Sequence, residues 1–218
     1  MTTDNILNNE VELTGTLETD LKFSHEVYGE VFYSFVIRVL RLSDISDLIN
    51  VTISERLIKD INLSKGDTVN ITGQFRSYNN YTDTGNKLML TVFARDINTS
   101  PDETMFKNPN SIYLNGFLCK KPVYRTTPFG REITDLLVAV NRAYNKSDYI
   151  PCIAWGRNAR FAGSLEVGEN IKIQGRIQSR DYQKKISETE NITKTAYEIS
   201  ISKMETVAKK DEFEFEII

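Results

Sequence analysis

The chain has 218 residues, with 27 Lys or Arg and 30 Asp or Glu, so its formal net charge is −3. Its 40 % hydrophobic residues are enough for a folded core, but no apolar run reaches the roughly 18 residues of a membrane span. The first residues lack the basic and apolar segments of a secretion signal, so we expect a cytoplasmic protein with no membrane partner. The net charge argues at first sight against nucleic acid, since its binders usually carry a basic footprint.

The residue types that carry most catalysis and metal binding are scarce. His25 is the only histidine, and Cys119 and Cys152 lack the paired spacing of a zinc site. The sequence has no phosphate-binding loop motif, no zinc-protease motif and no serine-nucleophile motif. We therefore expect a protein that is not an enzyme and that holds no metal and no cofactor.

The chain repeats itself with a period of about 101 residues. Residues 11–15, 35–41 and 49–53 recur as 112–116, 136–142 and 150–154, and 65–73 recur as 167–175 after one inserted residue. A polar segment containing Pro101 separates the copies. The repeat predicts two domains of one fold, with these boundaries: 1–97 for the N-terminal domain, 98–109 for a linker, 110–207 for the C-terminal domain and 208–218 for a tail.

Each copy has the pattern of a small all-β domain. Short runs rich in Val, Ile, Phe and Tyr alternate with period 2 between Gly, Asn and Asp turns, and residues 54–63 and 158–165 have the spacing of one short helix. About five strands and one helix in each copy predict two tandem five-stranded barrels of the OB type. Gly15, Gly73, Gly116 and Gly175 fall where such a barrel needs sharp curvature. A β-sandwich is the alternative.

The strand predicted over residues 149–155 places two large aromatic residues on one face. Because side chains two apart share a face, Ile150, Cys152 and Ala154 are expected inside, and Tyr149 and Trp155 outside with Pro151 and Ile153. Exposed aromatic rings can stack on nucleic-acid bases of any sequence. The alternative is that Trp155 packs under a loop or in a subunit contact.

The next predicted strand adds a basic row. Ile171, Ile173, Gly175 and Ile177 are expected inside, which leaves these residues facing outward: Lys172, Gln174, Arg176, Gln178 and Arg180. Three cations on one row can pair with phosphates, although such a row is more often a solvated face. Tyr182 follows directly, and then come Lys184 and Lys185, which we expect in a loop before the last strand.

Five segments of the second copy, 111–116, 138–142, 148–156, 167–168 and 173–180, together resemble the bacterial single-stranded-DNA-binding proteins. The resemblance covers residues 110 to about 206. It implies an OB fold, sequence-tolerant binding of single strands in replication, recombination or repair, and four OB domains acting together, which here means a homodimer. By position, these residues match the family's base-stacking aromatics: Tyr144, Tyr149, Trp155 and Tyr182. Arg142 lies beside the first of them.

The first copy keeps the core pattern and loses most of this face. Tyr144, Tyr149 and Trp155 correspond to Ser43, Leu48 and Ser54. The weaker nucleic-acid-binding candidates that remain in the first copy are Arg76, Tyr78 and Tyr81. Residues 1–104 have a net charge of −7, residues 105–208 of +6, and residues 209–218 of −2.

We therefore predict that the C-terminal domain is the main binding unit. The N-terminal domain is expected to serve assembly or a partner and to contact DNA only weakly. The alternative function is an OB-fold scaffold subunit of a replication or mobile-element complex.

Residues 211–218 alternate between acidic and apolar side chains, with Phe213 and Phe215 on the apolar side. The resemblance implies an acidic tip that recruits replication and repair proteins. A strand that docks on a sheet edge explains the alternation equally well.

Overall fold

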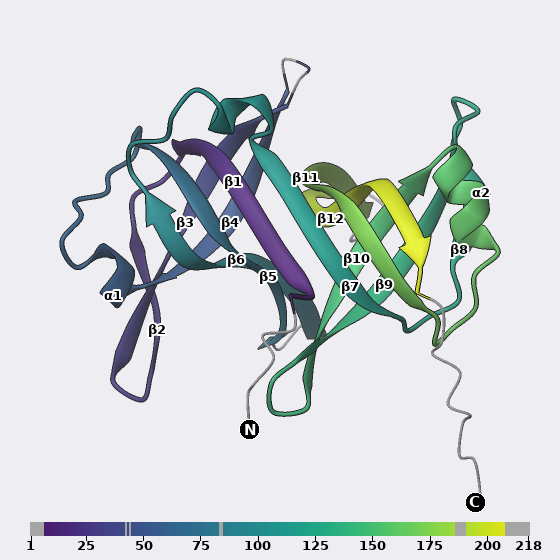
Figure 1. Cartoon of the computed structure of the whole chain (residues 1–218), viewed down its shortest axis with the longest axis horizontal. Helices are drawn as coiled ribbons and strands as arrows, with labels where there is room; N and C mark the ends of the chain where they lie inside the picture. The colour runs from purple at the N-terminus through teal and green to yellow at the C-terminus, as the bar shows by residue number, and fades with distance from the viewer. Residues whose placement is uncertain (1–6, 42, 44, 83–84, 186–190, 208–218) are drawn as a thin grey trace, which may run out of the picture.

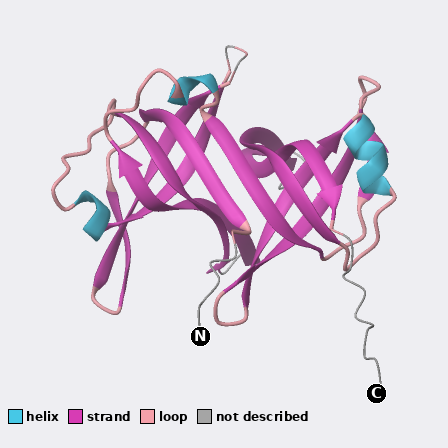
Figure 2. Ribbon diagram, in the orientation of Figure 1, coloured by secondary structure: helices cyan, strands magenta, loops and turns pink. Residues whose placement is uncertain are grey.

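The computed structural model describes residues 7–41, 43, 45–82, 85–185 and 191–207, and its elements are nearly all strands (Figure 2). The first repeat forms β1 (Asn9–Leu17), β2 (Lys22–Val27), β3 (Glu30–Leu40), β4 (Ser46–Ser54), α1 (Glu55–Ile58), β5 (Thr68–Thr82) and β6 (Gly85–Asn98). The second repeat forms β7 (Asn110–Leu118), β8 (Val123–Thr126), β9 (Glu132–Arg142), β10 (Lys146–Trp155), α2 (Arg157–Gly163), β11 (Asn170–Lys185) and β12 (Asn191–Thr206). The 3₁₀ turn η1 (Met105–Lys107) lies between them.

Each repeat closes into a barrel, and the two barrels lie side by side (Figure 1). In the first, β1 pairs with both β5 and β3, and β4 pairs with β6, so five strands form a closed ring. The second closes in the same way through β7, β9, β10, β11 and β12. This arrangement matches the predicted all-β fold with one short helix in each domain.

Two details of the elements differ from the sequence expectation. Both repeats have a sixth strand, because β2 and β8 extend the sheet as antiparallel partners of β3 and β9 outside the closed ring. Both helices are also shorter than predicted.

Inside the rings, alternate residues of each strand are buried, and burial of an aliphatic side chain stabilises the fold by roughly 1.5–3 kcal/mol. Leu13, Ile71 and Ile171 are fully buried examples.

Glycine is required where β1 crosses β3 and where β7 crosses β9. A Cβ on Gly15 or Gly116 would lie within 3 Å of the carbonyl oxygen of Arg38 or Ala139, on β3 and β9. Only a residue without a side chain allows that approach, which supports the predicted role of these glycines in closing a narrow barrel.

The two barrels are joined by continuous strand pairing. β1 and β7 run antiparallel from Asn9 opposite Leu114 to Leu13 opposite Asn110, which unites all strands into one twelve-stranded sheet. Asn9 and Asn110 are equivalent in the repeat, and each exchanges two hydrogen bonds with one residue of its own barrel. The Asn9 side chain donates to the Phe75 carbonyl oxygen and accepts from the Phe75 N–H. Asn110 makes the same two bonds with Ile177, and all four donor–acceptor distances are 2.7–2.9 Å.

Two buried aspartates reinforce this junction. Asp47 of β4 is fully buried and accepts hydrogen bonds from the Ser179 backbone N–H of the other barrel (2.8 Å) and from the Arg41 guanidinium (2.6 and 2.8 Å). Asp148 of β10 is its counterpart and accepts from the Ser77 backbone N–H at 2.8 Å. Removal of one partner from a buried ion pair strongly destabilises the folded state. Movement of one barrel against the other would break these contacts, so they hold the barrels in one orientation.

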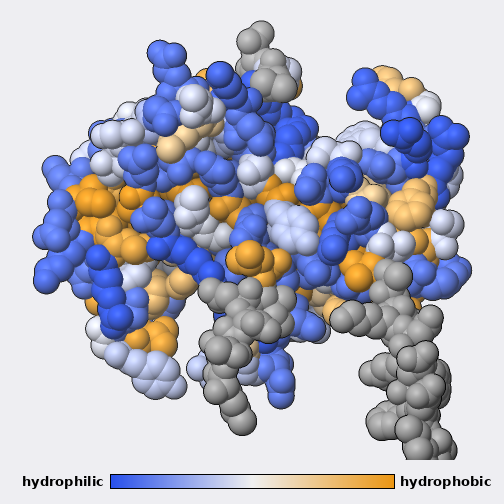
Figure 3. Space-filling model, viewed as in Figure 1, coloured by the Kyte–Doolittle hydropathy of each residue, from blue (hydrophilic) through white to orange (hydrophobic). Residues whose placement is uncertain are grey.

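The face seen in Figure 1 mixes hydrophilic residues with an interrupted band of hydrophobic ones (Figure 3). In the part of the chain that the structure describes, no helix is long and apolar enough to cross a membrane.

Candidate nucleic-acid interface

A groove on the second barrel brings three of the predicted site residues together. It is bounded by Trp155 at the end of β10, by Arg176 and Arg180 of β11, and by Arg125 and Arg131 of the β8–β9 hairpin, and its volume is about 590 Å³. We call it the C-terminal groove. Its size lies within the range of about 300–1,000 Å³ that is usual for ligand sites.

The aromatic side of this groove is larger than the sequence suggested. Trp155 is 37 % exposed and shares an adjoining hollow with Phe129, which is 92 % exposed at the tip of the β8–β9 hairpin. The hairpin does reach Trp155, as the alternative interpretation required, but it leaves part of the ring open. Two accessible rings beside one groove can each stack on a base.

The groove is strongly basic. Among the described residues, its lining contains five arginines and one carboxylate, Glu198. Burial lowers the pKa of the Arg176 guanidinium, and the nearby charge of Arg41 lowers it further, while Asp47 acts in the opposite direction. Like charges held this close create a positive potential in which a phosphate is favoured.

Arg41 is the residue of this groove that comes from the other barrel. Its Nη2 donates to the Ser179 carbonyl oxygen at 3.2 Å and to Asp47, which fixes the guanidinium at the groove wall. Sequence reasoning missed Arg41, because the contact spans 138 residues of chain. It also missed the β8–β9 hairpin, for which the basic and aromatic composition of residues 120–131 was an available signal.

Gln178 faces outward from the barrel, as predicted for the basic row, but it is not open to solvent. The side chain is buried, and its Nε2 donates to Glu198 Oε1 at 2.7 Å. The two residues are opposite each other on β11 and β12, so a cross-strand pair forms the polar floor of the groove. Arg180 reaches the same Glu198 oxygen at 3.8 Å.

Lys172 does not line the C-terminal groove. It lies 3.9 Å from Glu205 of β12 and borders a small separate cavity with Tyr113 and Gln174. The outward row predicted on β11 therefore divides: its first residues face the β7 side, and Arg176 and Arg180 face Trp155. The strand is strongly curved, with a register shift at Gln174, and this curvature separates side chains that a straight strand would align.

Tyr149 and Tyr144 lie at the other end of β10 from Trp155. Tyr149 is half exposed, and six residues along one strand separate it from Trp155 by about 20 Å. Tyr144 is almost fully exposed in the β9–β10 turn, with φ of 60°. Arg142, at the end of β9, reaches Asp148 at 3.4 Å and lines a cavity on the first barrel instead, together with Arg76 and Tyr78.

Lys184 and Lys185 were expected in a loop after Tyr182, and this is wrong: β11 continues to Lys185 and pairs with β12 as a long ribbon. Their side chains lie outside the described residues, as does that of Tyr81. The tail with Phe213 and Phe215 also lies outside the described residues.

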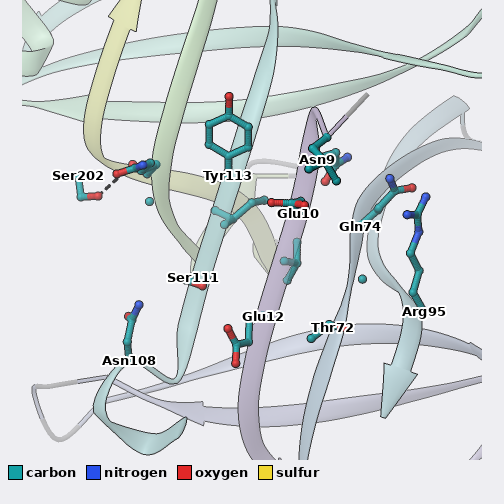
Figure 4. Close-up of a pocket in the computed structure, with 16 residues that line it drawn as sticks. Asn9, Glu10, Glu12, Thr72, Gln74, Arg95, Asn108, Ser111, Tyr113 and Ser202 are labelled. Atoms are coloured by element: carbon teal, nitrogen blue, oxygen red, sulfur yellow. Dashed lines mark hydrogen bonds between the residues drawn. The ribbon is translucent and has the colours of Figure 1, made fainter. Parts of the chain in front are cut away.

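A larger cavity, of about 620 Å³, lies over the β1–β7 junction and contains none of the predicted site residues. Figure 4 shows Glu10 and Glu12 of β1 at its centre, with Gln74 and Arg95 on one side and Tyr113 on the other. Two carboxylates in the middle would repel a phosphate chain, so this cavity is a poor site for nucleic acid.

Comparison with known proteins places the second repeat in a family. The model of the single-strand binding protein family matches residues 109–207. The single-stranded DNA-binding protein of Clostridium tetani is 37 % identical over 83 residues, which are 35 % of this chain and 57 % of that protein. The single-stranded DNA-binding protein of Oceanobacillus iheyensis is 30 % identical over 104 residues, 44 % of this chain and 64 % of that one. The chain spans about half the length of the curated relatives it matches.

A solved structure extends the likeness to both barrels. The wild-type single-stranded DNA binding protein from Thermus aquaticus superposes with a TM-score of 0.73 and covers 92 % of this chain and 93 % of its own, at 19 % identity. At that identity the likeness concerns the fold, and it confirms two OB barrels in one chain. Residues 109–207 therefore match the single-strand binding protein family, and the whole chain has a fold of two OB barrels in one polypeptide.

Proposed function

We propose that this chain binds single-stranded DNA with little sequence preference, and that the C-terminal groove is its main site. The observation that carries the proposal is that Trp155 and five arginines line one groove of the family-like domain, with Phe129 in the adjoining hollow. Coating of single strands in replication, recombination or repair is the role that this binding would serve. This proposed role involves no catalysed reaction.

In this mechanism, bases and phosphates contact different walls. Trp155 and Phe129 offer stacking faces, each worth roughly 1–3 kcal/mol for one base. Arg176, Arg180 and Arg131 offer hydrogen-bond donors to phosphates. Tyr149 and Tyr144 would extend the path of the strand along β10, beyond the end of the groove.

The division of labour between the barrels is part of the proposal. The C-terminal domain is the main binding unit, and two chains associate to bring four barrels together. Isolated domains are a poor test of it, because cutting the chain would expose the edges of β1 and β7 and would leave Asp47 without Ser179. Point variants of the full chain avoid that problem.

Trp155 fluorescence tests the function directly, because Trp155 is the only tryptophan. Titration with oligo(dT) should quench it, and the affinity should fall as salt rises. Light scattering on the same sample should give twice the chain mass. Absence of quenching at low salt would contradict DNA binding in this groove and would favour the scaffold function instead.

A further inference from the structure

The floor of the C-terminal groove contains a carboxylate, although the walls of the groove are basic. Glu198 of β12 is the one acidic side chain among the described residues that line the groove, and it is 9 % exposed. The five arginines of the lining come from the β8–β9 hairpin, from β11 and from the first barrel. A negative charge on the floor and positive charges on the walls divide the groove into two chemically different parts.

A chain of hydrogen bonds fixes the orientation of the Glu198 carboxylate. Arg176 Nη2 donates to Gln178 Oε1 at 3.3 Å, and Gln178 Nε2 donates to Glu198 Oε1 at 2.7 Å. Arg180 Nε lies 3.8 Å from the same Glu198 oxygen. Both ends of the Gln178 amide are therefore used within the protein. The other carboxylate oxygen, Glu198 Oε2, accepts no hydrogen bond from the residues that the structure describes, which leaves it available to a ligand in the groove.

Glu198 is separated from the aromatic wall of the groove. β10 and β12 pair in parallel, with Ile153 opposite Ser200, and both residues line the groove. Trp155 lies two residues beyond Ile153, and Glu198 lies two residues before Ser200. About four residues of strand, or roughly 13 Å, therefore separate Trp155 from Glu198. A base that stacks on Trp155 does not span this distance, so the base that reaches Glu198 belongs to a neighbouring nucleotide of the same strand.

The phosphates and the bases of a single strand interact differently with such a floor. A carboxylate repels a phosphate, so the phosphates are expected on the arginine walls and the base edges toward Glu198. Cytosine offers the donor N4 amino group to an acceptor, whereas thymine has the O4 oxygen at the same ring position. The one ring N–H of thymine is flanked by two carbonyl oxygens, which a carboxylate repels. Glu198 is therefore a better partner for cytosine than for thymine.

We propose that Glu198 makes the C-terminal groove selective at one nucleotide, where it favours a base with an exocyclic amino group, such as cytosine, over thymine or uracil. The selectivity rests on the proposed function, because a bound single strand supplies the base. Stacking on the aromatic rings and phosphate contacts with the arginines stay independent of sequence. The preference is therefore confined to one position of the strand, and the rest of the binding tolerates any sequence.

Trp155 fluorescence of the full chain measures this preference with oligo(dC) and oligo(dT) of equal length. The two bases have rings of the same size and differ at the position that faces the carboxylate. Compared with Glu198→Gln, the wild type should favour oligo(dC) over oligo(dT) by about 10-fold, the value for one hydrogen bond to a charged group. The substituted amide keeps an acceptor for Gln178 and adds an N–H donor that suits thymine O4.

The ratio of the two affinities separates recognition of the base from a general effect of charge. Removal of the Glu198 charge should strengthen the binding of both oligonucleotides, because phosphates near the groove are repelled less. If Glu198 acts through its charge alone, both affinities rise by the same factor and their ratio is unchanged, which would overturn the proposal. Glu166→Gln is the matched control, because Glu166 is exposed in the same barrel and lies outside the groove lining. It should leave the ratio as in the wild type.

Oligo(dU) provides a second test that requires only the wild type. Uracil lacks the methyl group of thymine but has the same carbonyl oxygens, so oligo(dU) should bind like oligo(dT). If it binds like oligo(dC), the methyl group causes the difference and the proposal is wrong. Equal affinities for all three oligonucleotides, in the wild type and in Glu198→Gln, would overturn the selectivity and leave the proposed function intact. No quenching by any of them at low salt would contradict both.

Discussion

Replacement of Asp47 with alanine removes the most completely satisfied contact between the two barrels. The variant would leave the Ser179 N–H and the Arg41 guanidinium without their acceptor in a buried place. Loss of one partner from a buried ion pair costs about 3–5 kcal/mol. Asp148→Ala is the matched comparison, because it removes one short hydrogen bond, from Ser77, and two long contacts, to Arg142 and Arg76. We expect about 1–3 kcal/mol there.

The difference, about 2 kcal/mol, is large enough to measure. For a chain of this size it corresponds to a difference in Tm of about 4–8 °C. Urea unfolding of the wild type, Asp47→Ala and Asp148→Ala should be followed at one protein concentration, because association of chains contributes to apparent stability. Equal losses, or a larger loss for Asp148→Ala, would refute the conclusion that hydrogen-bond geometry at Asp47 provides the stronger junction.

The remaining predictions concern DNA binding and pH. Arg180→Gln should weaken oligo(dT) binding and reduce the slope of log K against log salt by about 0.7, the value for one phosphate contact of a single strand; an unchanged slope in a Trp155 titration would exclude that contact. Phe129→Ala should cost about 1–3 kcal/mol of binding free energy, while exposed Phe106→Ala should cost none; similar affinities of the two variants would remove Phe129 from the site. Burial raises the pKa of Asp148 above its ordinary value, so the folded state holds this proton more tightly than the unfolded state. Wild-type stability should therefore fall relative to Asp148→Asn as pH rises from about 4, the ordinary value, through the raised value; parallel pH profiles in thermal unfolding would contradict the shift.

Local patterning made the barrels predictable. The period-2 alternation and the glycines where strands approach closely are visible in the sequence itself. Because the chain contains the repeat twice, each of these signals appears twice. The outward side of β10 followed from the same alternation, so the exposure of Tyr149 and Trp155 agrees with the sequence expectation. The predicted roles of these two residues in binding stay predictions.

The outer face of β11 was less predictable. Strand alternation indicates on which side of the sheet a side chain lies, but it does not indicate which residue of the neighbouring strand lies beside it. Gln178 faces outward from its barrel as expected, yet Glu198 of β12 buries it. Lys172 shares its side with Arg176, but the curvature of the strand directs the two residues to different cavities.

The sequence alone determined the repeat, the fold, the two aromatic residues on β10 and the opposite charges of the halves, because these depend on composition and on spacing along the chain. Only the tertiary structure decided which residues share a site. Arg41 lies in the groove of the second barrel and Arg142 lines the cavity of the first, because pairing of β1 with β7 brings each arginine against the other barrel. Such a neighbourhood arises from chain segments more than a hundred residues apart, and no local pattern records it.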